Sequence, residues 1–127
     1  MDENIAKLVF DKMMSKDHFS QWLGIEGVEH REGYCQIKIE VKKEMLNGFG
    51  ITHGGITYSL ADSALAFAAN SRGYQSVSIE TSINHLKPTN VGDVLLAEAK
   101  EINLSNKTGL FEVKIYNQEE ELVALFK

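Results

Sequence analysis

The sequence predicts an α+β domain in which a mainly antiparallel sheet wraps one long helix. Two observations lead to this prediction. A proline-free stretch rich in Ala and Leu spans residues 56–71, and four strand-like segments separated by turn residues follow it, at 76–86, 94–104, 110–117 and 122–126. One helix followed by an antiparallel meander favours packing of that helix on one face of the sheet.

The N-terminal part of the chain supplies a further helix and a strand. Apolar side chains recur at helical spacing over residues 2–19, which predicts an N-terminal helix with one apolar face. From residue 27 onward the pattern changes to alternation, clearest between Cys35 and Val41, where every second side chain is apolar. We therefore expect a half-buried strand in this region.

A glycine-rich loop separates that strand from the long helix. Residues 47–55 read NGFGITHGG, and four glycines in nine positions exclude regular structure and imply positive φ or close backbone approach. In the helix that follows, larger apolar residues gather on one side, at Ile56, Leu60, Ala64 and Phe67. The other side is made of small residues and one acid, at Gly55, Ser59, Asp62, Ala66 and Ala69. We expect both faces to be buried, the second against something that approaches closely.

Length and composition favour one domain, residues 1–127, because the chain has the usual size of a domain and is 43% hydrophobic. No stretch approaches the roughly 20 apolar residues of a membrane span, and the N-terminus opens acidic rather than as a secretory signal. With a single cysteine, Cys35, these features predict a cytoplasmic protein. A net charge of −5 argues against nucleic acid as a partner.

The candidate chemistry lies where the loop meets the helix. Gly54 and Gly55 offer backbone N–H groups at the positive end of a helix, which suits a phosphate or a developing oxyanion. Asp62 lies two turns further along in an apolar helix, where an ionised carboxylate is costly without partners. Eight residues of helix separate Gly54 from Asp62 by about 12 Å along the axis. Two copies of the helix, antiparallel about a two-fold axis, would bring Gly54 of one chain to Asp62 of the other.

These residues resemble the hotdog-fold thioesterases of the PaaI type, which are linked to phenylacetate degradation. The motif that carries the resemblance consists of Asn47, Gly50, His53, Gly54, Gly55 and Asp62. Three further stretches are similar to the family's central helix, proline turn with its next strand, and final hairpin: SLADSALAFAANSRG, INHLKPTNVGDVLLAEAK and VKIYNQEEELVALFK. The resemblance covers nearly the whole chain from residue 18.

The resemblance implies hydrolysis of an acyl-CoA, of the aryl-acetyl or medium-chain kind, in a homodimer that pairs further into a tetramer. The Gly54 N–H would polarise the thioester carbonyl, while Asp62 of the partner subunit would activate water or attack directly. Asn47 and His53 would align the carbonyl and the loop. Gly55 and Ser78 would bind the substrate. No cofactor or metal is implied, since coenzyme A is part of the substrate.

Simpler interpretations stay open for several of these residues. Asn47 is equally well explained as a turn former, His53 as a helix terminator, and Ser78 as an ordinary strand residue. His18, His30 and His85 show no metal-ligand spacing. Positive charge for the CoA phosphates has three candidates, each also explained as a solvated surface group: Arg72, Lys87 and Lys107.

Two other functions compete with hydrolysis. A dehydratase or hydratase of the same fold could use His53 and Asp62 near the α and β carbons, although the HGG loop differs from the histidine-proline-glycine loops of dehydratases. A non-catalytic acyl-CoA-binding module would need the pocket but not a carboxylate at position 62.

Overall fold

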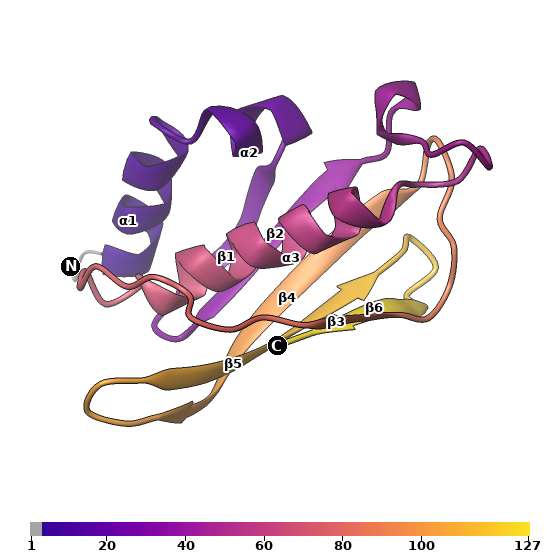
Figure 1. The fold of residues 1–127 in the computed structure, drawn as a ribbon. Helices are drawn as coiled ribbons and strands as arrows, with labels where there is room; N and C mark the ends of the chain where they lie inside the picture. The colour runs from indigo at the N-terminus through magenta and orange to yellow at the C-terminus, as the bar shows by residue number, and fades with distance from the viewer. Residues whose placement is uncertain (1–3) are drawn as a thin grey trace.

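The computed structural model describes residues 4–127, which form one sheet curved around one helix (Figure 1). Six strands are hydrogen-bonded in the order β1-β2-β4-β5-β6-β3, and every neighbouring pair is antiparallel. The strands are β1 (Glu26–Arg31), β2 (Tyr34–Glu40), β3 (Ile83–His85), β4 (Val94–Leu104), β5 (Gly109–Tyr116) and β6 (Leu122–Phe126). Helix α3 (Gly54–Ala69) lies across the concave face of this sheet. The predicted α+β architecture is confirmed.

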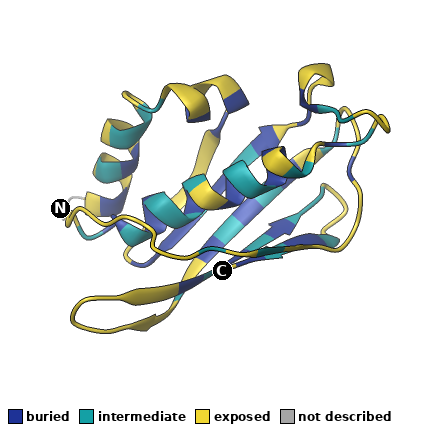
Figure 2. Cartoon of the chain, in the orientation of Figure 1, coloured by how far each residue is buried: buried dark blue, intermediate teal, exposed yellow. Residues whose placement is uncertain are grey.

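The core lies between α3 and the sheet. The four larger apolar residues predicted for one side of the helix, from Ile56 to Phe67, are all buried. They pack on alternate residues of the central strands, which are completely or almost completely buried: Ile37, Ile39, Leu95, Ala97, Ala99, Val113 and Ile115. Figure 2 shows this division, with buried positions between helix and strands and exposed ones on the outer side of α3. The small-residue side of α3 therefore faces outward in the single chain.

The N-terminal segment forms two helices rather than the single one predicted over residues 2–19, of which residues 2 and 3 lie outside the described part. Helix α1 (Ile5–Met14) ends before Ser15, and α2 (His18–Leu23) begins after Asp17. The side chain of Asp17 accepts a hydrogen bond of 3.0 Å from the Ser20 N–H and so caps a new helix. None of the helices described for residues 4–127 combines the length and apolarity that crossing a membrane requires.

The region predicted as one strand from residue 27 is a hairpin of β1 and β2. The chain reverses at residues 32–33, where Gly33 has a φ of +70°. Glycine adopts this left-handed conformation without strain, which explains why the alternation could continue on both sides of the turn.

The strand predicted over residues 76–86 forms only at its end, as β3. Ser82 still pairs with Lys127 through two backbone hydrogen bonds, but residues 77–81 have no neighbouring strand and no regular structure, and the chain bends at residue 79. This segment runs along one side of α3, at the open edge of the sheet (Figure 1). Val77 and Ile79 are 82% and 86% exposed there. A strand needs a neighbour for its backbone groups, and one chain offers none at this edge.

Candidate active site

The glycine loop is held in place by its own hydrogen bonds. The Asn47 side-chain oxygen accepts the Phe49 N–H at 2.9 Å, and the Asn47 N–H donates to the Ile51 carbonyl at 2.8 Å. The N–H of Thr52 donates to the Thr89 carbonyl at 2.8 Å, fastening the end of the loop to the segment that precedes β4. Asn47 therefore shapes the turn, as one of its two interpretations predicted.

His53 is the N-cap of α3. Its Nδ1 accepts the Gly55 N–H at 2.8 Å, while its carbonyl accepts the Ile56 N–H at 2.9 Å. Because Nδ1 is an acceptor, the proton of the neutral ring lies on Nε2. In the described part of the chain the Gly54 N–H meets no acceptor. The start of α3 thus leaves one donor, that of Gly54, free for a ligand.

Glycine is required at both helix positions by close neighbours. A Cβ at Gly55 would lie 3.0 Å from His53 Nδ1, and one at Gly54 would lie 3.2 Å from Cε1 of His85. These distances are tighter than ordinary contacts, so a larger residue would displace an imidazole or the loop. The HGG triplet therefore has a steric reason as well as a chemical one.

Asp62 lies on the outward side of α3 and remains accessible in the single chain. The surrounding helices still shield it from part of the solvent, and this partial burial raises the pKa of its carboxyl group, with the negative charge of Asp17 raising it further. In the described residues it takes part in no hydrogen bond or ion pair. A carboxylate in such surroundings is a stronger base than a free one, which suits a proton acceptor.

Helix α2 is joined to α3 next to this carboxylate. The hydroxyl of Ser20, completely buried, donates to the Asp17 carboxylate at 2.6 Å and lies 2.9 Å from the Ser63 hydroxyl. Ser63 follows Asp62 in the chain, so this network fixes α2 along the flank of the candidate base.

The remaining predicted site residues lie apart from this group. Ser78 is exposed on the unpaired segment before β3 and has no described hydrogen-bond partner. Arg72 is engaged with both carboxylate oxygens of Glu101, at 2.6 and 3.0 Å. Lys87 pairs with Glu121. Two of the three basic candidates for CoA phosphates are therefore already neutralised within the chain.

Two residues that were not predicted as site residues lie next to Gly54. The Thr57 hydroxyl donates to the Gly54 carbonyl at 3.0 Å and lies 2.7 Å from Nε2 of His85. A hydroxyl three residues after the first helical glycine was a weak signal in the sequence. Nothing local indicated His85, because its contact spans 28 positions of the chain.

The fold and the similarity to known proteins together define a hotdog-fold thioester hydrolase. A family model described as "Thioesterase superfamily" matches residues 49–124, which include the helix start, Asp62, strands β3 to β5 and the first part of β6. The chain belongs to the thioesterase superfamily, and within it to the PaaI type.

Individual relatives support this assignment. A protein of Archaeoglobus fulgidus is 43% identical over 97% of this chain and 80% of its own length. The acyl-coenzyme A thioesterase PaaI of Escherichia coli is 37% identical over 91% of this chain and 82% of its own.

Solved structures agree with the sequence comparisons. The structure of E. coli PaaI, from the phenylacetic acid degradation operon, superimposes with a TM-score of 0.94 at 36% identity, covering 96% of this chain and 88% of that one. A Streptococcus mutans protein solved bound to acetyl CoA gives a TM-score of 0.78 at 29% identity, covering 80% and 82%. The hotdog fold expected from the sequence is thereby confirmed.

Proposed function

We propose that this protein hydrolyses an acyl-CoA thioester to a free acid and CoA, in a site completed by a second copy of the chain. The Gly54 N–H polarises the thioester carbonyl, and the partner's Asp62 acts as general base or as nucleophile. The observation that carries this proposal is the free N–H of Gly54 at the start of a 16-residue helix whose only acid lies on its outward side.

Geometry requires the second chain. Along one helix, Gly54 and Asp62 are about 12 Å apart, much more than the reach of a single thioester group. An antiparallel copy of α3 would bring its Asp62 opposite Gly54 and produce two equivalent sites per dimer. The small residues around Asp62 on the outward side, Ser59, Ala66 and Ala69, would permit the close approach that this arrangement needs.

The open edge of the sheet supports the same dimer. The backbone of residues 77–81 has no strand beside it, and this segment carries two of the most exposed aliphatic side chains of the described chain, Val77 and Ile79. Pairing with the same segment of a second copy would satisfy the backbone groups and cover these side chains. Association of two dimers into a tetramer stays a prediction from the resemblance, as do the cytoplasmic location and the extent of the domain over residues 1–127.

The chemistry balances with water as the only co-substrate. In the general-base route the partner's Asp62 takes a proton from water as the water oxygen bonds to the thioester carbon, and the carbonyl oxygen becomes an oxyanion held by the Gly54 N–H. The carbon–sulfur bond then breaks, and CoA leaves as a thiolate that is protonated by the acid just formed or by solvent. In the nucleophilic route the carboxylate bonds to the carbon first, the carbon–sulfur bond breaks with release of CoA thiolate, and water then hydrolyses the resulting anhydride to the free acid and the carboxylate. No cofactor takes part.

The other predicted residues support this site. His53 accepts the Gly55 N–H and keeps it from competing for the carbonyl oxygen, while the side-chain oxygen of Asn47 fixes the loop. Gly55 lines the path of the thioester, and Ser78 would contact the substrate from the dimer edge. CoA as the thiol part is supported by the similarity to a structure with acetyl CoA, and an aryl-acetyl group by the similarity to PaaI from the phenylacetic acid degradation operon. A medium-chain acyl group stays a prediction from the resemblance.

Release of free thiol from a panel of CoA esters tests this proposal. The panel should hold acetyl, medium-chain and phenylacetyl esters together with an enoyl-CoA, and Asp62→Asn is the matched variant. We expect turnover with at least one ester and a loss of about 10²- to 10⁴-fold in Asp62→Asn, the usual contribution of a positioned base. Full turnover by Asp62→Asn would falsify the assigned role, and loss of enoyl absorbance without thiol release would indicate a hydratase.

A further inference from the structure

The first peptide groups of α3 are clamped from two sides by histidines. On the loop side, His53 Nδ1 accepts the Gly55 N–H at 2.8 Å. On the sheet side, the Gly54 carbonyl accepts the Thr57 hydroxyl at 3.0 Å, and that hydroxyl is 2.7 Å from Nε2 of His85. Both polar atoms of the peptide group that joins Gly54 to Gly55 are therefore occupied.

The Thr57 hydroxyl has one proton, so it can donate either to the Gly54 carbonyl at 3.0 Å or to Nε2 of His85 at 2.7 Å. We assign the proton to the bond with the carbonyl, and the Thr57 oxygen then accepts the second bond. His85 is then the donor, through Nε2–H, and its Nδ1 has no described partner. The result is a chain of donors that runs from His85 through Thr57 to the carbonyl of Gly54.

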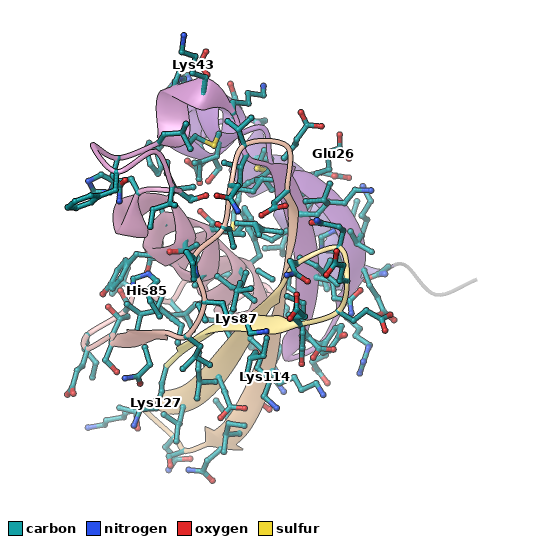
Figure 3. All side chains as sticks on the ribbon, turned by 90° about the vertical axis from the view of Figure 1, so that its right-hand side faces the viewer. Glu26, Lys43, His85, Lys87, Lys114 and Lys127 are labelled. Carbon is teal, nitrogen blue, oxygen red and sulfur yellow. The ribbon has the colours of Figure 1, made fainter. Side chains whose placement is uncertain are left out.

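His85 also lies close to Gly54. Its Cε1 is 3.2 Å from the position that a Cβ of Gly54 would occupy, and Figure 3 shows His85 labelled beside α3. Thr57 itself is buried, at 5% exposure, so its hydroxyl needs these partners. An imidazole from the edge strand thus lies beside Gly54, whose N–H meets no acceptor in the described part of the chain.

We propose that His85 and Thr57 are positioning residues that fix the Gly54 backbone for carbonyl polarisation. This inference rests on the proposed function. Two consecutive glycines at a helix start have unusual backbone freedom, and the first turn of a helix frays most easily. A donor chain on one side and His53 on the other remove that freedom, so the Gly54 N–H points at a fixed place before substrate arrives. Preorganised donors of this kind stabilise the transition state more than the bound substrate.

Four variants of the full chain test the proposal. Thr57→Val and His85→Phe keep size and remove the donors, whereas Thr57→Ser and His85→Gln keep a donor at a similar place. Thr108→Val, in the β4–β5 hairpin, applies the same chemical change where the side chain has no described hydrogen bond.

Turnover should separate the two pairs of variants. We expect Thr57→Val and His85→Phe to lower kcat about 5- to 50-fold with KM changed less than about twofold, because the loss falls on the transition state. Thr57→Ser and His85→Gln should keep most of the wild-type kcat. The Thr57→Val/His85→Phe double variant should have a kcat no lower than that of the less active single variant, because both changes break the same hydrogen-bonded unit. Unchanged kcat in both donor-free variants, or equal losses in all four, would overturn the proposal.

A second measurement does not depend on turnover. Labelling with ¹⁵N-glycine allows exchange of the Gly54 and Gly55 amide protons to be followed in the free enzyme. Exchange of the Gly55 proton should be at least about fivefold faster in the donor-free variants and unchanged in Thr108→Val, since loss of the clamp increases local opening. Unchanged exchange would contradict the clamp even if the enzyme is active. Conversely, full turnover by Asp62→Asn with faster exchange in these variants would refute the proposed function and leave the clamp intact.

Discussion

Ser20 and Ser63 hold α2 against α3 through hydroxyls that lie 2.9 Å apart, one residue away from the candidate base Asp62. Ser20 is completely buried and also donates to Asp17. The N-terminal helices are therefore part of the candidate site's surroundings. Helix α2 borders the site, and the carboxylate of Asp17, its N-cap, lies near Asp62.

Removing the buried hydroxyl should destabilise the fold. Ser20→Ala deprives Asp17 and Ser63 of a shared partner, and we expect a loss of about 1–3 kcal/mol in the free energy of unfolding, the usual cost of an unsatisfied buried group. Urea unfolding at a fixed protomer concentration measures it, because association also contributes to stability. Ser105→Ala, at the exposed hairpin turn, is the control. A change within error of that control would show that the network contributes nothing.

Removing the charge of Asp17 should shift the pH dependence of turnover. The Asp17 carboxylate raises the pKa of Asp62, so Asp17→Asn lowers that pKa and moves the acid limb of kcat/KM to lower pH. Asn is also a good N-cap, so α2 should keep its start. The profile is compared with that of Glu112→Gln, the same charge change on β5. An acid limb at the same pH as in the wild type would show that Asp17 does not influence the site. A shift of the limb to higher pH would contradict the predicted direction of the pKa change.

Substituting Gly54 should damage the site more than the fold. A Cβ at Gly54 meets His85 at 3.2 Å, so Gly54→Ala displaces either the imidazole or the helix start. We expect kcat to fall by at least about tenfold, because the Gly54 N–H is kept but moved from its place, and one well-placed oxyanion donor contributes about 10²- to 10³-fold. Gly48→Ala is the matched control, since a Cβ there has no neighbour within 4 Å. Equal activities of the two variants would argue against a role of Gly54.

Charge on the open edge should separate the subunits. Ile79→Lys places an ammonium on the segment that we propose pairs with its copy, and lysine on an edge strand opposes pairing. We expect a higher proportion of monomer by light scattering and a parallel loss of turnover that is relieved at higher protein concentration. Ile102→Lys, at an exposed position of β4, is the control for the added charge alone. A fully active monomer would end the shared-site proposal.

Acid should weaken the packing of α1 on β1. His30 is buried between these elements, stacked on Phe10 at 4.1 Å with no described partner for its Nε2. Burial lowers the pKa of His30, and the Lys7 charge lowers it further, against smaller opposing effects of Asp11 and Glu29.

The folded state thus binds the His30 proton less readily than the unfolded chain. Stability from this residue is present above the unfolded pKa of about 6.5 and declines as the pH falls below it. Urea unfolding of wild type and His30→Leu between pH 8 and 5 should show a shallower decline in the variant. Equal slopes would exclude His30 as the cause.

Local sequence patterns determined most of the elements. The helix from 56 onward and the strands at 94–104 and 122–126 were predicted within two residues, because side chains repeat direction every 3.6 residues in a helix and every second residue in a strand. The same reasoning identified the glycine loop and Asp62 as unusual, since neither suits an ordinary loop or an apolar helix. It failed at residues 15–17 and 32–33, where single capping and turn residues interrupt a continuing pattern.

Only the tertiary structure decided which of these residues meet. The contact of Thr57 with His85, the bond of Ser20 to Ser63 and the missing neighbour of residues 77–81 all depend on the order of strands and on where α3 crosses the sheet. A local pattern records the direction of a side chain within its own element. It does not record which distant element will lie opposite, because that choice is made by packing of the whole chain.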